Sequence, residues 1–268
     1  MNDPHEVRVC SAQISSIWEN PEQTLDKAQV FIRHAAVSGA SLICFPEQFA
    51  TGWDPESDHY QEDINGRIVS VLRDFARDNS IAILGSFREK GSALPKNTAV
   101  VIGKDGRILA TYAKTHLFSP GNEQDSYQPG TDLGIFTVGT LICGIAICYD
   151  LRFPDLFRIY AEKGVHAVMV PAAWPSKRIQ QWELFIAARA AENQMYVAGI
   201  NTTGKTPVDR YPGSSMTADP QGTIISRAND AEQMLFSELD PSVVEQARRV
   251  FPVHQDRKEL LYSILSRK

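Results

Sequence analysis

Buried, β-branched stretches alternate with amphipathic helical segments in both halves of this chain, and this repeated order limits the folds available to it. Residues 7–14 and 41–45 have the pattern of strands, and a helix between them begins at the cap residue Asn20 and runs to Ala36. A strand, a crossover helix and a second strand of this length form a parallel pair with a right-handed crossover. The sequence therefore predicts an α/β protein.

Antiparallel strands are added to this parallel framework. Asp105 and Gly106 join the strand-like runs 97–103 and 107–112, and Asp-Gly is a strong hairpin signal. A second hairpin through Gly139 leads into an apolar run at 141–147. Further helices are predicted at 66–79, 154–164, 180–194 and 241–250, and further strands at 81–87, 166–171, 195–201, 214–218, 222–227 and 234–239.

Two such halves do not easily form one long open sheet covered on both faces. Two mixed sheets packed face to face, each with helices outside, bury both faces, so we predict a four-layer αββα sandwich. No linker rich in proline, glycine or serine marks a boundary, and residues 1–268 are expected to form a single domain. Residues 251–268 form an apolar tail, which is expected to dock on another surface.

The composition argues against several classes of protein. The net charge is -5 with no basic stripe, so nucleic acid is not an expected partner. No apolar run approaches the roughly 20 residues of a membrane helix, and no signal peptide precedes the first strand, so we expect a soluble, cytoplasmic protein. Four cysteines without a CxxC pair and six scattered histidines predict reduced thiols and neither a metal nor another cofactor.

Three ionisable residues each follow a predicted strand: Glu47, Lys114 and Cys148. Sheets wound in this way gather such strand ends on one side, where ligands bind. A free thiol has a pKa of about 8.5, so attack on a carbonyl needs a nearby base or cation, and the other two residues supply one each. Taken singly, each is more often an ordinary solvated or core residue. Cys143 lies within the apolar run and is expected to be buried.

Four segments closely resemble the signature segments of the nitrilase, or carbon-nitrogen hydrolase, superfamily. They are FPE at 45–47, YAKTHLF at 112–118, PGNE at 120–123 and GIAICYDLRFP at 144–154. The likeness covers nearly the whole chain, because 219–222 and 251–257 also look like the family's late turn and tail. It implies an αββα sandwich, a Glu-Lys-Cys triad and assembly as dimers, with residues 251–268 docked at the dimer interface.

Carried onto this sequence, the resemblance makes Glu47 the general base, Lys114 the electrostatic stabiliser and Cys148 the nucleophile. Lys114 and the backbone N–H of Tyr149 would hold the tetrahedral oxyanion, and its collapse would expel ammonia and leave a thioester for water to hydrolyse. Glu123 matches the family's additional glutamate and is assigned to orienting Lys114 or the substrate amide.

Residues 148–154 and 173–175 look most like the omega-amidase branch, which hydrolyses the terminal amide of 2-oxoglutaramate and 2-oxosuccinamate. Arg152 suits a substrate carboxylate, because arginine binds carboxylates bidentately, but it is equally expected to pair with Asp150 or Asp155. Many relatives carry glutamate at position 155, so any role of this shorter carboxylate is open. Lys177 and Arg178 are expected to be ordinary surface residues.

Other residues near the predicted strand ends have weaker signals. His116 is expected to make a structural hydrogen bond. Six aromatic residues are candidates for the wall of a small pocket, or for packing alone: Phe49, Trp53, Tyr60, Phe118, Tyr149 and Trp174.

The alternatives within the superfamily are an N-carbamoyl amino acid hydrolase, an aliphatic amidase and a nitrilase, which would use the same triad. A non-catalytic interaction protein with this fold would show a decayed triad, whereas all three positions are intact.

Overall fold

The structure is a computed structural model that describes residues 6–265. One mixed sheet contains six strands, in the order β14 (Gln233–Leu239), β1 (Val7–Gln13), β2 (Leu42–Cys44), β3 (Ala82–Glu89), β4 (Lys96–Ile102) and β5 (Ile108–Ala113). The strands β1, β2 and β3 are parallel, as the strand-helix-strand pattern predicts. The strands β4 and β5 form the predicted antiparallel hairpin at Asp105 and Gly106.

The second sheet repeats this arrangement. Its order is β13 (Ile224–Arg227), β12 (Met216–Ala218), β9 (Tyr196–Asn201), β8 (Ala167–Ala172), β7 (Leu141–Ile145) and β6 (Gly134–Val138). The strands β7, β8 and β9 are parallel, and β6 joins β7 through the predicted turn. Gly139 has a φ of 57° in this turn, a conformation that glycine adopts without a steric penalty.

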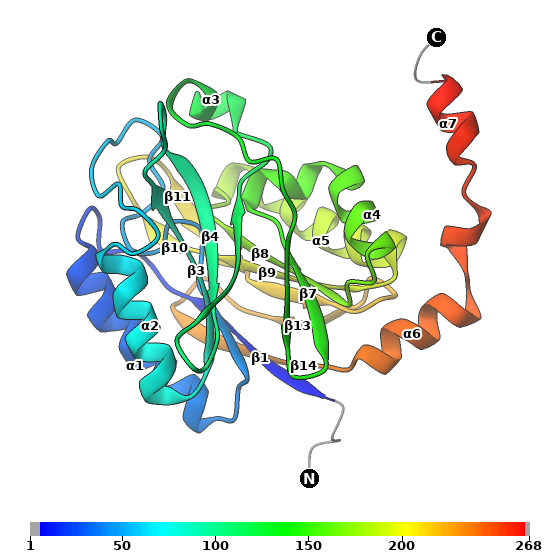
Figure 1. Ribbon diagram of the computed structural model, residues 1–268, viewed down its shortest axis with the longest axis horizontal. Coiled ribbons are helices and arrows are strands. Elements are labelled where there is room, and N and C mark those ends of the chain that lie inside the picture. The colour runs from blue at the N-terminus through cyan, green and yellow to red at the C-terminus, as the bar shows by residue number, and fades with distance from the viewer. Residues whose placement is uncertain (1–5, 266–268) are drawn as a thin grey trace.

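Helices cover the outer faces of both sheets (Figure 1). Helices α1 (Pro21–Val37) and α2 (Arg67–Asn79) pack on the first sheet, and α4 (Pro154–Glu162) and α5 (Ile179–Asn193) pack on the second. Between the sheets, Leu84 and Val101 from one side join Cys143 and Met169 from the other in a single buried cluster. The predicted αββα sandwich and the buried position of Cys143 are confirmed.

Two loops contain more structure than their sequences indicate. Residues 113–133, between the predicted strands that now correspond to β5 and β6, contain the short helix α3 (Glu123–Ser126), for which no helix was predicted. A hairpin of β10 (Thr203–Lys205) and β11 (Arg210–Pro212) was not predicted at all. Strands of three residues are too short for an alternation of polar and apolar residues to be recognisable.

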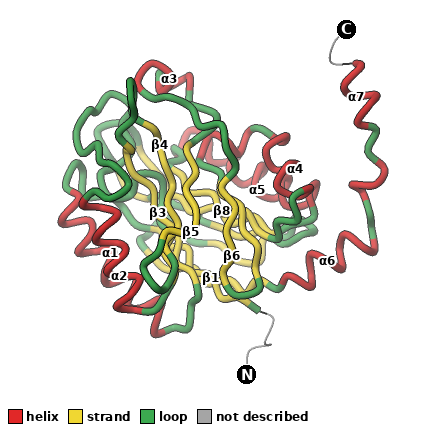
Figure 2. Tube along the Cα trace, in the orientation of Figure 1, coloured by secondary structure: helices red, strands yellow, loops and turns green. Residues whose placement is uncertain are grey.

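The C-terminal residues extend away from the sandwich (Figures 1 and 2). Helix α6 (Pro241–Val250) leads to a 3-10 turn at Val253–Asp256 and then to helix α7 (Glu259–Leu265). Four apolar side chains of α7 are exposed: Leu260, Leu261, Ile264 and Leu265. Docking of the tail stays a prediction, and its last three residues lie outside the described part. Within residues 6–265, no helix has both the length and the apolar character needed to cross a membrane.

Candidate active site

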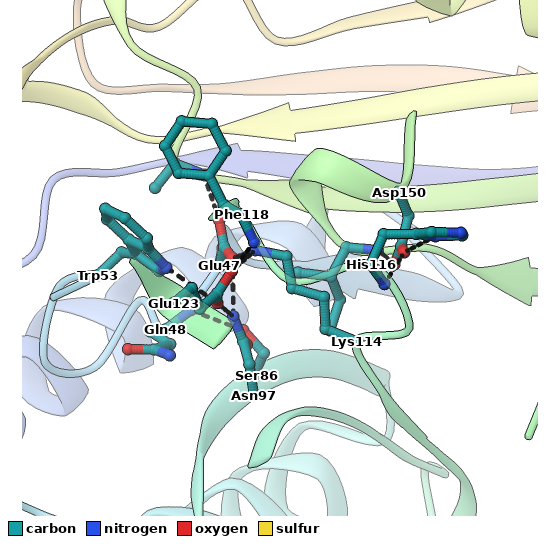
Figure 3. A network of polar contacts seen from close by, with 12 residues as sticks. Glu47, Gln48, Trp53, Ser86, Asn97, Lys114, His116, Phe118, Glu123 and Asp150 are labelled. Atoms are coloured by element: carbon teal, nitrogen blue, oxygen red, sulfur yellow. Dashed lines mark hydrogen bonds and ion pairs between the residues drawn. The ribbon is translucent and has the colours of Figure 1, made fainter. Parts of the chain in front are cut away.

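Three of the predicted site residues meet in one buried cluster (Figure 3). Glu47 follows β2, Lys114 follows β5 and Glu123 begins α3. The Nζ atom of Lys114 lies 2.8 Å from Oε1 of Glu47 and 2.8 Å from Oε2 of Glu123. All three side chains are buried, so the ammonium is held between two carboxylates with little access to water.

The charges of this cluster stabilise one another. Burial by itself would lower the pKa of Lys114, but Glu123 and Glu47 outweigh it and hold that pKa well above its usual range. Burial would raise the pKa of Glu123, but Lys114, helped by the backbone N–H of Phe118, holds that pKa below its ordinary value. At neutral pH Lys114 is therefore a fixed cation and Glu123 a fixed anion.

Two further groups fix the carboxylate of Glu47, and the sequence signals neither of them. The side-chain amide of Asn97, on β4, donates to Oε1 of Glu47 at 2.8 Å and to Oε1 of Glu123 at 3.1 Å. The backbone N–H of Ala173 donates to Oε2 of Glu47 at 3.0 Å. Asn97 is a buried polar residue at the start of a strand, which local sequence does not distinguish from a turn residue.

Cys148 lies beside this cluster. The strand β7 ends at Ile145, so Cys148 is not at the strand end but begins a 3-10 turn at Cys148–Arg152, with a φ of 46°. Its thiol is half-buried. Burial and the negative charge of Glu47 raise the pKa of this thiol well above its usual range, whereas the charge of Lys114 lowers it. The thiol therefore keeps its proton in the free protein, with Glu47 close enough to affect it.

A cavity whose empty volume is about 440 Å³, with the solvent at its mouth included, contains Cys148, Glu47 and Lys114 in its wall. Four of the six predicted aromatic residues line it: Trp53, Phe118, Tyr149 and Trp174. The other two do not, because Phe49 is buried against Phe45 and Tyr60 is exposed. Tyr211 and Asp209, from the unpredicted hairpin, complete the wall.

Arg152 also lines this cavity and pairs with neither Asp150 nor Asp155. Its guanidinium donates to Oε1 of Gln181 at 2.6 Å and lies 4.9 Å from the ring centre of Trp174. Both expected ion pairs are therefore absent among the described residues.

Arg178, which was expected to be an ordinary surface residue, lines the cavity too. Its guanidinium lies 5.0 Å from the ring centre of Phe118. Within residues 6–265, neither Arg152 nor Arg178 forms an ion pair with an acidic side chain. Lys177, by contrast, is exposed and pairs with Asp209 at 3.3 Å, as a surface lysine does. The cavity thus has two cations without a protein counterion.

Replacing Glu123 with glutamine is expected to lower the free energy of unfolding at pH 7 by about 1.5–3 kcal/mol, because a hydrogen bond to a charged group is lost. The folded-state pKa of Glu123 lies below the ordinary value of 4.5, so its contribution is present above that pH and is lost as the pH falls through the folded pKa. The stability difference between wild type and Glu123→Gln should therefore narrow below about pH 4.5, as measured by urea unfolding from pH 7 to pH 3.5.

The exposed Glu22, paired with Arg67, provides the control for this experiment. Glu22→Gln is expected to change stability little at any of these pH values, because exposed ion pairs are screened by solvent. A stability difference for Glu123→Gln that stays constant across the range would contradict the linkage.

Comparisons with known proteins identify the class. The carbon-nitrogen hydrolase family model matches residues 8–249, and the chain belongs to this family. It is therefore an enzyme, a hydrolase of the amidase type, and the resemblance in the sequence is confirmed. Within residues 6–265, no group of three or more histidine, cysteine, aspartate or glutamate side chains is placed to hold a metal ion.

The relatives and solved structures that match this chain include three amidases. The 2-oxoglutaramate amidase of Bacillus subtilis (strain 168) is 30% identical over 93% of this chain and 97% of its own. The omega-amidase NIT2 of Homo sapiens is 32% identical over 96% of both chains. A solved variant of the amidase from Nesterenkonia sp. AN1 shows covalent addition of the acetamide moiety of fluoroacetamide at its active-site cysteine. It matches with a TM-score of 0.84 at 26% identity, over 95% of this chain and 98% of its own.

Proposed function

We propose that this chain is a cysteine-dependent amidase that hydrolyses the terminal amide of small carboxylate-bearing molecules, of the type of 2-oxoglutaramate and 2-oxosuccinamate. The observation that carries the proposal is the ammonium of Lys114, fixed 2.8 Å from Glu47 and from Glu123 in a cavity whose wall also contains the thiol of Cys148. The covalent adduct on the cysteine of the Nesterenkonia amidase supports this assignment of the nucleophile.

In the first half of the reaction, Glu47 removes the proton from Cys148 as the sulfur attacks the amide carbonyl. Lys114 and the backbone N–H of Tyr149 stabilise the oxyanion, and the loss of one such donor typically costs about 2.7–4 kcal/mol of barrier. Glu47 then passes its proton to the leaving nitrogen, the C–N bond breaks, and ammonia leaves. The product is a thioester on Cys148.

In the second half, Glu47 removes a proton from a water molecule, whose oxygen attacks the thioester carbonyl. The C–S bond breaks, the thiol recovers its proton from Glu47, and the carboxylic acid leaves. One water is consumed for each ammonia released. Glu123 takes no proton in this scheme, because its pKa is held low, and it keeps Lys114 in place.

The proposal is tested by measuring ammonia release from 2-oxoglutaramate, L-glutamine, N-carbamoyl-β-alanine and a simple nitrile. We expect the highest kcat/KM for 2-oxoglutaramate. A clear preference for the carbamoyl compound or the nitrile would assign the chain to another branch of the superfamily. No ammonia from any of the four would contradict the proposed substrate class.

Arg152 is expected to bind the substrate carboxylate, because it faces the cavity without a protein counterion. We expect Arg152→Met to lower the ratio of kcat/KM for glutaramate to that for pentanamide about 10- to 100-fold. These amides have the same chain length and differ in a terminal carboxylate or methyl group, and a charged hydrogen bond contributes about 1.5–3 kcal/mol. Ammonia release measures both rates.

Lys205→Met is the matched control, because it removes an exposed positive charge from the β10–β11 hairpin, whose Tyr211 lines the same cavity. We expect it to change the ratio less than about 3-fold, since exposed charges are strongly screened. An unchanged ratio in Arg152→Met would remove this residue from the substrate site. A wild-type preference for pentanamide would instead favour an aliphatic amidase. The aromatic side chains in the cavity wall are also compatible with an uncharged aliphatic substrate.

We further propose that the protein acts as a homodimer in the cytoplasm. The exposed apolar side chains of Leu260 and Ile264 on α7 support docking of the tail on a second copy. The four cysteines are all free, which suits a reducing compartment.

A further inference from the structure

The backbone at Cys148 adopts a conformation that needs external support. Its φ of 46° lies in the left-handed region, which costs free energy for any residue with a side chain. The residue follows the end of β7 and begins the short 3-10 turn that aims its thiol toward Glu47 and Lys114. Such a conformation persists only where surrounding contacts fix it.

The carboxylate of Asp150 supplies those contacts. It is fully buried, and its Oδ2 accepts the backbone N–H of Ile147 at 2.9 Å. The backbone N–H of Asp150 in turn donates to the carbonyl of Ile147 at 3.0 Å. Both hydrogen bonds join Ile147 to Asp150, so they hold the backbone on either side of Cys148.

The same carboxylate reaches the segment that carries Lys114. Its Oδ2 also accepts the hydroxyl of Tyr112 at 2.7 Å, and its Oδ1 accepts the backbone N–H of His116 at 2.9 Å. Tyr112 and His116 stand two residues before and two residues after Lys114. Asp150 therefore links the turn of the nucleophile directly to the end of β5.

His116 completes this arrangement. Its Nδ1 lies 2.8 Å from Oδ1 of Asp150, which confirms the predicted structural hydrogen bond. Because a carboxylate accepts hydrogen bonds, the contact requires a proton on Nδ1. The imidazole also stacks on the ring of Phe153, with the centres 3.7 Å apart. Asp150, His116 and Tyr112 are absent from the wall of the cavity, so none of them is placed to contact substrate.

We propose that Asp150, fixed by Tyr112 and His116, is a positioning residue that holds the Cys148 turn and the Lys114 strand end in one rigid arrangement. The proposal rests on the function proposed above, in which the sulfur of Cys148 attacks the substrate. It assigns to these three residues an effect on the rate of the chemical step rather than on substrate binding. A misplacement of about 1 Å can cost about 100-fold in rate.

The test uses variants that each remove one side-chain partner of the Asp150 carboxylate. Tyr112→Phe removes the hydroxyl alone, and His116→Ala removes the imidazole N–H. We expect each to lower kcat for 2-oxoglutaramate about 10- to 100-fold, with KM changed less than about 3-fold. His116→Asn places an amide N–H near the position of Nδ1, and we expect it to recover most of the kcat that His116→Ala loses.

Tyr160→Phe is the matched control for stability. Tyr160 is also a buried tyrosine, and its hydroxyl bonds the carbonyl of Ile145 on β7 and the backbone N–H of Gly134. We expect this variant to lower the Tm about as much as Tyr112→Phe while leaving kcat within about 3-fold of wild type. If both tyrosine variants lose the same fraction of kcat, or if the losses appear in KM, the positioning role is wrong.

A second readout does not depend on amide hydrolysis. Iodoacetamide alkylation of Cys148, followed by peptide mass spectrometry, reports the reactivity of this thiol, because Cys10, Cys44 and Cys143 are buried. We expect slower alkylation in Tyr112→Phe and His116→Ala and a wild-type rate in Tyr160→Phe. Slower alkylation with no ammonia from any amide would contradict the proposed function but support the positioning role. Unchanged alkylation together with unchanged kcat would overturn the positioning role alone.

Discussion

Replacing Cys148 with alanine is expected to lower kcat/KM for 2-oxoglutaramate by about 10,000-fold or more, because it removes the atom that carries the proposed acyl intermediate. The expected loss exceeds that of any other single change, since both halves of the reaction pass through the sulfur. Stopped-flow measurement of ammonia release should show neither a burst nor a steady rate. Mass spectrometry of wild-type enzyme quenched during turnover should locate an acyl adduct on Cys148.

Cys143 provides the matched control, because it lies on the same polypeptide stretch but is buried between the two sheets. Cys143→Ala is expected to lower stability modestly and to leave kcat per folded molecule within about 3-fold of wild type. An adduct on Cys143, or substantial turnover in Cys148→Ala, would require a different nucleophile.

Replacing Glu47 with glutamine is expected to lower kcat/KM about 100- to 10,000-fold, which is the usual contribution of a general base. Glutamine retains the size of the side chain but cannot take the proton of the thiol or of water. Lys114 keeps its second carboxylate, Glu123 at 2.8 Å, so the fold of the site should survive. Steady-state ammonia release measures the loss of kcat/KM, and the Tm of the variant shows whether the fold survives.

Glu19 offers a matched control away from the cavity. Its carboxylate lies 2.8 Å from the buried guanidinium of Arg88, so Glu19→Gln also removes a carboxylate from a buried cation. We expect it to lower the Tm without a comparable loss in kcat. Equal losses of kcat in the two variants would mean that Glu47 acts through the fold rather than through the reaction.

Part of the active site could be predicted from local sequence. Glu47, Lys114 and Cys148 stand out because polar residues that follow apolar strands are readable from short stretches, and parallel strands bring such ends to one side of a sheet. The observed distances between Lys114 and the two glutamates agree with that expectation. The roles of these residues in catalysis stay proposals until the variants are measured.

Other features could not be predicted in this way. Arg178 has the sequence context of a surface residue, yet its side chain faces the cavity across Phe118. Asn97 bridges the two carboxylates from a neighbouring strand, and Asp150 turned out to bind backbone and tyrosine groups instead of Arg152. Apart from the bond between Asp150 and the nearby Ile147, each partner lies far away along the chain, so no periodicity in the sequence marks the contact.

The sequence by itself determined the order of the principal strands and helices, and with it the two-sheet sandwich and the segments after three strands that carry Glu47, Lys114 and Cys148. Periodicity and turn residues specify these features because they act between neighbours along the chain. Only the tertiary structure decided that the ammonium of Lys114 lies between two carboxylates and that one aspartate joins the Cys148 turn to the neighbouring sheet. Those contacts arise from the packing of two sheets, whose register is fixed by side chains distant in the sequence.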